Sequence, residues 1–309
     1  MQRRQLGATG LTVSAVGFGG WAIGGPARLG DAVLGWGPRD DRRALAALET
    51  ALDCGIDFFE TADIYGGGHS EELIGQAFAG KRDRVILATK AGNCMDACGG
   101  WVKDFSAQHL RRALEGSLRR LRTDHVDLFQ LHSPREGFLY VEALFETLEG
   151  FKAEGKIRHH GISIASLDDG ELLAERGWGE TLQVPYSMLQ REVEERVLPA
   201  ASTAEMGVIA RTPLAGGWLT GKYDEDTVFH PDDWRSRRYP RESRAELVEA
   251  VDRLRHLERP DRTLSQSAIA FCLQHPAIST VIPGARNPAQ VAENAAACDL
   301  EPPPVTLDA

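Results

Sequence analysis

The sequence lacks the features of disulfide-stapled, membrane-spanning and nucleic-acid-binding proteins. Its 309 residues contain five cysteines, an odd number without a framework pattern, which is typical of a reducing cytoplasm. No apolar run approaches the length of a transmembrane helix, and the opening residues Met1–Leu6 contain no apolar signal-peptide stretch. The net charge of −10 argues against binding to nucleic acid or to a membrane surface. We therefore expect a cytoplasmic protein with neither of these partners.

Linkers, low-complexity tracts and internal repeats are also missing. Hydrophobic residues make up 42% of the chain and charged residues 26%, the balance of an ordinary globular protein. A chain of this length can bury a large core, and an α/β barrel reaches this size as one domain. We predict one domain over residues 1–309.

What is present is an alternation of short apolar runs, rich in β-branched and aromatic residues, with amphipathic stretches. The apolar runs predict buried strands over Val13–Gly19, Asp57–Ala62, Val85–Ala91, Val126–His132, Ile157–Ile164, Leu182–Met188, Gly207–Leu214 and Thr280–Pro283. The amphipathic stretches predict helices over Asp41–Asp53, Ser70–Phe78, Ala107–Leu121, Val141–Glu154, Val193–Glu205 and Ser265–Gln274.

Eight strands with intervening helix-sized segments are typical of a closed (β/α)₈ (TIM) barrel. Residues Gln2–Gln5 and Leu11–Ser14 flank a Gly-Ala-Thr-Gly turn and predict an N-terminal β-hairpin, which could plug one end of the barrel. Ser243–Leu257 predicts an extra helix before the last βα unit. A doubly wound sheet has the same local pattern and stays open as the alternative.

Titratable side chains are concentrated where three consecutive strands end. The predicted second strand runs into Glu60 and, shortly after it, Tyr65. The third ends at Lys90 and the fourth at His132. Because barrel active sites lie at the carboxyl ends of the strands, these four groups are predicted to share one site.

This set of groups matches the needs of carbonyl reduction. Hydride that arrives at a carbonyl carbon leaves an alkoxide, which a positioned acid must protonate. Tyrosine is a weak acid with a pKa near 10, and an adjacent Lys ammonium stabilises the phenolate and lowers that pKa. A carboxylate can hold the lysine, and an imidazole can orient the substrate oxygen.

These residues, with several flanking motifs, resemble the aldo-keto reductase family over nearly the whole chain. The motifs are Leu6–Leu11, Asp63–Gly66, Gln130–Pro134 and Ile282–Arg286. The resemblance implies an NADP(H)-dependent oxidoreductase acting on a small aldehyde, ketone or sugar carbonyl, or on the alcohol. In that reading Tyr65 is the proton donor, Lys90 its partner and His132 the orienting residue.

Glu60 departs from the family, which has aspartate at this position. The extra methylene either displaces the Lys90 ammonium or forces the carboxylate to fold back. A displacement of ~1 Å can cost on the order of a hundredfold in rate. We predict a modest loss of rate or a shifted substrate class, with the Glu60–Lys90 pairing retained.

The loops after the last two predicted strands are suited to an anionic cofactor. Glycines in these loops permit close approach of the backbone to a pyrophosphate, and a helix start at Asn287-Pro288 presents free amides. Arg286 at that start could bind a 2′-phosphate bidentately, which favours NADP(H). Cofactor contacts predicted from these loops and from the glycine-rich end of the first strand are Gly20, Trp21, Pro213, Leu214, Gly216, Gly284 and Arg286.

The family resemblance adds further cofactor residues. It implies Gln290 and Asn294 at the adenosine end and Ser163 and Gln183 at the nicotinamide carboxamide. Two positions depart from the family pattern. Ile164 stands where asparagine is usual, and Arg211 stands where many members place an aromatic ring, although a guanidinium could also stack there.

Substrate specificity is predicted to reside in the loops Trp21–Gly37, Gly92–Phe105 and Tyr223–Arg241. Trp21, Tyr65 and Trp101 could form an aromatic-walled pocket for sugar faces or flat rings. The physiological substrate, the reaction direction and the oligomeric state are left open by the sequence.

Other functions and sites were weighed against this reading. A nicotinamide-binding sensor subunit with little turnover, and a sugar epimerase or dehydratase with transient hydride transfer, stay as alternatives. Cys94 and Cys98 could form a zinc or redox pair, but no second ligand pair accompanies them, so no metal site is predicted. Gly161–Ala165 imitates a nucleophile elbow without its final glycine.

Overall fold

The computed structural model describes residues 1–98, 100–134 and 142–303. Its centre is an eight-stranded parallel sheet in which neighbouring strands follow one another in chain order. Parallel bridges between Val16 and Val281 and between Gly19 and Gly284 join the first strand to the last. The strands are β3 (Phe18–Gly19), β6 (Phe58–Glu60), β7 (Ile86–Ala91), β10 (Val126–His132), β11 (Ile157–Ser163), β12 (Thr181–Pro185), β13 (Gly207–Arg211) and β14 (Ile278–Ile282).

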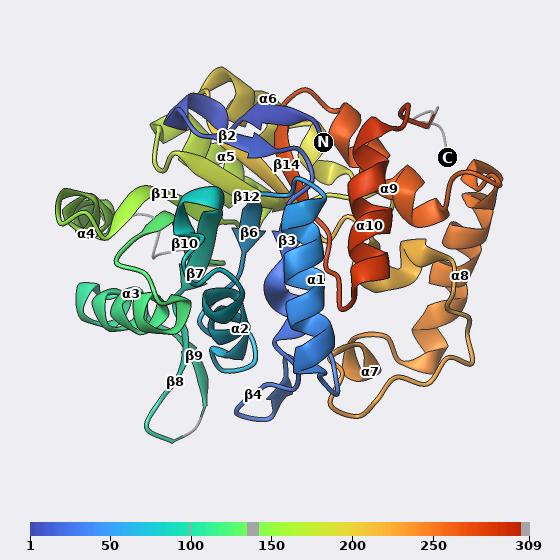
Figure 1. Ribbon diagram of the computed structural model, residues 1–309, viewed down its shortest axis with the longest axis horizontal. Coiled ribbons are helices and arrows are strands. Elements are labelled where there is room, and N and C mark those ends of the chain that lie inside the picture. The colour runs from blue at the N-terminus through green and yellow to red at the C-terminus, as the bar shows by residue number, and fades with distance from the viewer. Residues whose placement is uncertain (99, 135–141, 304–309) are drawn as a thin grey trace.

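This arrangement confirms the predicted (β/α)₈ barrel. A doubly wound sheet reverses its strand order at a switch point, whereas here the order is sequential and the two ends of the sheet meet. The helices pack around the outside of the sheet (Figure 1). They are α1 (Asp41–Asp53), α2 (His69–Ala77), α3 (Ala107–Leu121), α4 (Glu142–Ala153), α5 (Leu167–Arg176), α6 (Val197–Thr203), α9 (Leu264–Gln274) and α10 (Pro288–Ala296).

Several helices begin where a side chain caps the first turn. Asp40 accepts a hydrogen bond from the Arg43 amide at α1, and Ser106 accepts one from the His109 amide at α3. At α9, Thr263 and Gln266 form a reciprocal capping box. Such caps satisfy backbone donors that have no partner within the helix, which explains why α1 and α3 match their predicted bounds.

Two predicted elements need correction, and one helix was missed. The single strand predicted over Val13–Gly19 is divided, since its first part belongs to the hairpin and only β3 joins the barrel. The helix predicted over Val193–Glu205 is a 3₁₀ turn at Glu192–Glu194 followed by α6, with Pro199 in its first turn. Helix α5 was not predicted, and the predicted α4 start at Val141 lies outside the described residues.

The predicted N-terminal hairpin is present as β1 (Arg3–Gln5) and β2 (Thr12–Ser14), paired antiparallel. Leu6, Leu11 and Val13 from this segment are buried in one cluster with barrel residues, among them Phe58 and Leu128. The hairpin therefore closes the barrel end at which the strands begin, which we call the barrel floor.

The segments that project at the opposite end, the barrel mouth, are loops with short elements (Figure 1). They include the hairpins β4–β5 (Arg28–Leu29, Ala32–Val33) and β8–β9 (Asn93–Met95, Trp101–Lys103), and the short helix α7 (Arg235–Arg238). The predicted extra helix is present as α8 (Arg244–Arg253), followed by a 3₁₀ turn. Among the described residues, none of the helices combines the length and apolar character needed to cross a bilayer.

Candidate active site

The site is assembled from residues that occupy corresponding positions near the ends of neighbouring strands. Lys90 on β7 lies opposite Gln130 on β10, and Glu60 is the last residue of β6. Lys90, Gln130 and Glu60 are all at most 2% exposed. Burial of polar and charged groups is costly unless they pair with one another, so the contacts among these side chains define the site.

Glu60 and Lys90 form a buried ion pair. The Lys90 ammonium donates to Glu60 Oε1 and, at 2.8 Å, to the backbone oxygen of Thr61. Its Nζ atom also lies 4.7 Å from the centre of the Tyr65 ring. The pairing predicted for Glu60 is therefore present, with the ammonium positioned against the face of the tyrosine ring.

Tyr65 and His132 are brought together at the same place. Their ring centres are 5.8 Å apart and the rings are nearly perpendicular. Burial is the largest cause that lowers the pKa of His132 well below its usual value, and the positive charge of Lys90 is the second. This imidazole is therefore neutral near pH 7. Its Nδ1 atom is buried without a hydrogen-bond partner in the described part of the chain, which leaves a polar group for a ligand to meet.

The Tyr65 hydroxyl differs electrostatically from the prediction. Lys90 was expected to lower the pKa of Tyr65, but burial raises it above the ordinary value of 10. The cation that opposes this rise is Arg211, at the end of β13. Lys90 donates to Glu60 and Thr61, and its Nζ atom lies against the face of the Tyr65 ring.

The loop that carries Tyr65 depends on a glycine. Gly66 has a φ of +65°, and a Cβ atom there would lie 2.0 Å from the backbone oxygen of Gly24. A side chain at this position would therefore be excluded both by conformation and by space. The tight passage of this loop past Gly24 keeps Tyr65 beside Lys90.

Gln183 and Ser163, the two residues proposed for the carboxamide, are in contact. Ser163 Oγ donates to Gln183 Oε1 at 3.1 Å. The amide nitrogen of Gln183 donates to Glu60 Oε1 at 3.0 Å, a bond that joins the carboxamide position to the ion pair. The longer Glu60 side chain thus accepts from both Lys90 and Gln183.

Trp21 belongs to an aromatic cluster above Tyr65. Its ring centre is 6.0 Å from that of Tyr65, 5.4 Å from that of Trp36 and 5.0 Å from that of Trp234. Trp101, predicted as a third pocket wall, lies in the β8–β9 hairpin, is 47% exposed and stacks with Lys103. Among the described ring contacts, Tyr65 meets Trp21 and His132, and Trp21 also meets Trp36 and Trp234, two residues that no short motif marks.

A hollow of about 280 Å³ lies beside the start of α10. Arg286 and Gln290 line it, and the Gln290 side chain accepts from the Arg286 amide at 2.8 Å. Arg39 and Arg43, which sequence reasoning missed, line the same hollow together with Asp40. These residues lie at or just before the start of α1. They come close to α10 only because the closed barrel brings its first and last helices together.

The remaining predicted cofactor residues lie on the loops after β3, β13 and β14 and on α10. Gly216 has a φ of +69° in the 3₁₀ segment Ala215–Thr220 after β13, close behind Pro213 and Leu214. Gly284 pairs with Gly19, next to Gly20. Asn294 is buried on α10. Their contacts with the cofactor stay a prediction.

Comparison with known proteins agrees with this geometry. Residues 15–304 match the family model described as the aldo/keto reductase family. The chain belongs to this family. The chain is an oxidoreductase.

Three relatives illustrate the match. The aldo-keto reductase YhdN of Bacillus subtilis is 34% identical, over 94% of this chain and 87% of its own length. The NADH-specific methylglyoxal reductase of Escherichia coli is 30% identical over 97% of this chain and 94% of its own. A solved aldo-keto reductase of Klebsiella pneumoniae in complex with NADPH has a TM-score of 0.73 and 27% identity, and the match covers 98% of this chain and 92% of that one.

Proposed function

We propose that this aldo-keto reductase is an NADP(H)-dependent enzyme that reduces an aldehyde, ketone or sugar carbonyl, or oxidises the corresponding alcohol. The observation that carries the proposal is the convergence of four groups at the barrel mouth. Glu60 holds Lys90, Lys90 lies against the Tyr65 ring, and His132 lies next to Tyr65 with an unpartnered Nδ1 atom. Their roles are derived below from the properties of each group.

The hollow beside α10 fits the phosphate end of the cofactor. Arg39, Arg43 and Arg286 line it, and a guanidinium binds phosphate oxygens bidentately. The Arg286 guanidinium donates to the backbone oxygens of Trp36 and Pro38, and it would exchange these bonds for the phosphate. The amides at the start of α10, capped by Asn287, add partial positive charge. This arrangement favours the 2′-phosphate of NADP(H), although one relative is named as NADH-specific.

At the other end of the cofactor, Ser163 and Gln183 would hold the carboxamide. The Gln183 amide nitrogen has two hydrogens, and Glu60 accepts one of them at 3.0 Å. The second points toward Gln130 at a longer 3.4 Å and could be given to the cofactor instead. When bound, the nicotinamide supplies or accepts the hydride.

The chain's own residues supply the proton and the orientation. We infer that His132, being neutral, donates a ring N–H to the carbonyl oxygen and turns it toward Tyr65. Since burial raises the pKa of Tyr65, its hydroxyl keeps the proton near pH 7. As negative charge develops on the substrate oxygen, that proton moves from the Tyr65 oxygen to the substrate oxygen.

Arg211 would stabilise the phenolate left on Tyr65, while the Lys90 ammonium lies against the face of its ring. Arg211 lowers the pKa of Tyr65, and it also lowers the pKa of Lys90 after the larger effect of burial. Glu60 balances one of these two positive charges and keeps Lys90 in position. The buried setting makes these charge interactions stronger than they would be in water.

The aromatic cluster over Tyr65 suits a flat or sugar-like substrate. Trp21 and Trp234 present stacked rings with 5.0 Å between their centres next to the proposed proton donor. Such rings contact the apolar faces of sugars and planar carbonyl compounds.

The proposal is tested by following NADPH oxidation with a panel of aldehydes, ketones and keto-sugars. Tyr65→Phe removes only the donor hydroxyl and should abolish turnover while NADPH binding is retained. Unchanged turnover in this variant would remove Tyr65 from its role. Tight NADPH binding without turnover on any substrate by the wild-type protein would instead favour a sensing subunit.

The cofactor preference has its own test. Arg286→Met should weaken NADPH binding by about 10–100-fold, the range expected for lost charge-assisted hydrogen bonds, and leave NADH binding near the wild-type level. Arg253→Met on α8, far along the chain from these loops, is the matched control. Equal losses for both cofactors would contradict the 2′-phosphate assignment.

A further inference from the structure

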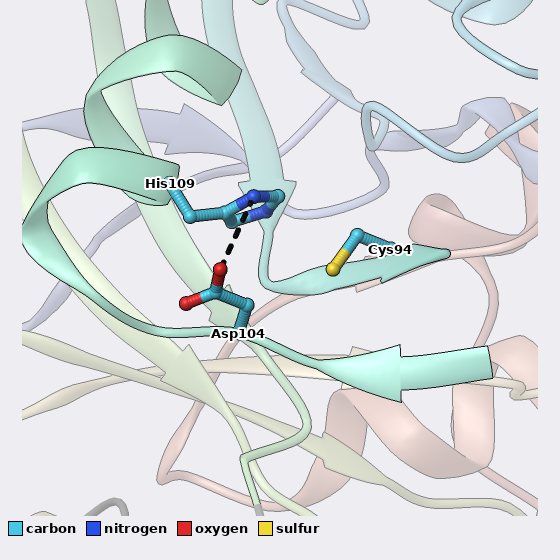
Figure 2. A group of neighbouring side chains, drawn as sticks. All are labelled: Cys94, Asp104 and His109. Atoms are coloured by element: carbon cyan, nitrogen blue, oxygen red, sulfur yellow. Dashed lines mark ion pairs between the residues drawn. The ribbon is translucent and has the colours of Figure 1, made fainter. Parts of the chain in front are cut away.

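Three side chains with metal-binding chemistry meet outside the proposed catalytic groups. Cys94 lies on β8, Asp104 follows β9, and His109 lies in the first turn of α3 (Figure 2). All three are partly buried. They offer a sulfur, a carboxylate oxygen and an imidazole nitrogen, a mixed set that suits zinc.

The spacing of these atoms is close to that of a bound ion. The three ligand atoms all lie within 4.8 Å of one another, and Asp104 Oδ2 is 3.8 Å from His109 Nδ1. Tetrahedral zinc with bonds of about 2.0–2.3 Å separates its ligand atoms by roughly 3.3–3.8 Å. Small side-chain adjustments of the order of 1 Å would therefore complete the site.

The surrounding bonds orient two of the three ligands. The Ser106 amide donates to Asp104 Oδ1 at 2.9 Å, which leaves Oδ2 directed toward His109. Ser106 Oγ in turn accepts from the His109 amide and fixes the start of α3. His109 Nε2 is buried and, within the described ranges, has no hydrogen-bond partner. The ring can therefore carry its proton on Nε2 and leave Nδ1, which faces Asp104 Oδ2, able to bind the ion.

The local charge also favours a cation. Burial raises the pKa of Cys94, and the carboxylates of Asp104, Asp63 and Asp96 raise it further, while Arg112 opposes them. Three carboxylates against one guanidinium make the position of this thiol attractive to a divalent ion. The 3.8 Å gap between Asp104 and His109 is too long for a hydrogen bond and is spanned well by a metal.

We propose that Cys94, Asp104 and His109 bind one zinc ion through three protein ligands, with water at the fourth position. The ion joins the β8–β9 hairpin to the start of α3 and so holds a loop of the barrel mouth in place. No metal site was predicted from the sequence, because Cys94 was paired there with Cys98 and no second ligand pair accompanies these two cysteines. None of the three ligands is a proposed catalytic residue, although Asn93 and Lys103 of the same hairpin donate to the backbone oxygen of His132.

The test uses the full chain, freed of metal by a chelator, and zinc alone as the probe. A competition titration with a chromophoric chelator should give one site per chain. Cys94→Ser, Asp104→Asn and His109→Ala should each weaken it by about 100-fold or more, since even the hydrogen-bonding partners of ligands are worth 10–100-fold. Cys98→Ser, a nearby exposed cysteine, is the matched control and should bind as the wild type does.

Cobalt substitution identifies the sulfur ligand. A thiolate-to-cobalt charge-transfer band is expected in the wild type and in Cys98→Ser, and should be missing from Cys94→Ser. Cys94→Ser is nearly isosteric, so circular dichroism without metal should match the wild type even if His109→Ala folds poorly. Wild-type zinc affinity in Cys94→Ser, or a cobalt band that follows Cys98, would overturn the proposal.

Discussion

The floor and the mouth of the barrel are built by the same strands and differ completely in chemistry. Phe58, Ala88, Leu128 and Ile209 belong to the apolar cluster closed by the N-terminal hairpin. Two residues further along each strand stand Glu60, Lys90, Gln130 and Arg211. Because side chains on a strand return to the same face every second residue, each strand contributes one member to both layers.

The two layers also differ in how well their groups are satisfied. The floor residues are apolar and need no partners. At the mouth, His132 Nδ1, Gln130 Nε2 and Arg211 Nε are buried without hydrogen-bond partners among the described residues. Unsatisfied buried polar atoms cost stability, so their concentration here indicates that the mouth is arranged for a ligand and the floor for folding.

The largest expected effect on kcat comes from Lys90→Met at the barrel mouth. We expect kcat to fall by about 10²–10⁴-fold, because the acid–base unit at Tyr65 loses its cation. The single variant should also unfold more easily, since Glu60 is left buried and unpaired. Steady-state kinetics and urea unfolding measure the two effects.

A double variant separates these effects. Lys90→Met combined with Glu60→Gln should recover part of the lost stability, because the carboxylate that had lost its partner is then neutral, but it should recover no activity. Wild-type kcat in Lys90→Met would show that the lysine takes no part in the reaction.

Phe58→Ala at the barrel floor should have the opposite effect, a loss of stability with little change in kcat. This ring is fully buried, and its removal should lower the free energy of unfolding by about 3–5 kcal/mol. At temperatures where the variant is folded, kcat should stay close to that of the wild type. A kcat loss as large as that of Lys90→Met would mean that the two layers are not separable.

A smaller effect is expected from Glu60→Asp, which restores the family residue. The shorter carboxylate should release the Gln183 amide for the cofactor while it keeps Lys90. We expect kcat to rise by on the order of tenfold, within the hundredfold that ~1 Å of displacement can cost. Glu60→Gln is the control that retains length without charge. Unchanged kcat and pH profile in Glu60→Asp would show that the extra methylene has no consequence.

The smallest effect concerns the pH dependence of stability. Burial, and after it the positive charge of Lys90, holds the pKa of His132 in the folded protein well below 6.5. Below pH 6.5 the unfolded chain therefore takes up a proton that the folded protein does not. Stability from this group is therefore complete above pH 6.5 and decreases as the pH falls toward the folded pKa, by at most about 1.4 kcal/mol per pH unit.

His132→Gln should flatten this loss between pH 7.5 and 5.5 in urea unfolding, relative to the wild type. The exposed His230→Gln is the control and should keep the wild-type slope. An unchanged slope in His132→Gln would assign the acid sensitivity to other groups.

Local patterns allowed the barrel and much of its site to be predicted. Helices α1 and α3 matched because a cap and an amphipathic repeat mark both. The division of Val13–Gly19 between two sheets could not be read from an apolar run, since the run continues through Ala15 and Val16 without a break. Trp36 and Trp234 lie in loops that were predicted to determine specificity, but their contact with each other was not predicted. These loops have no regular hydrophobic repeat that would show which side chains meet.

By itself, the sequence determined the alternation of strands and helices and the placement of Glu60, Lys90 and His132 at strand ends, because these depend on residues close together in the chain. The tertiary structure alone decided which distant groups meet. Gln183 reaches Glu60 across 123 residues, and Arg211 reaches Tyr65 from β13. Closure of the barrel brings these segments together, and no local period encodes that closure.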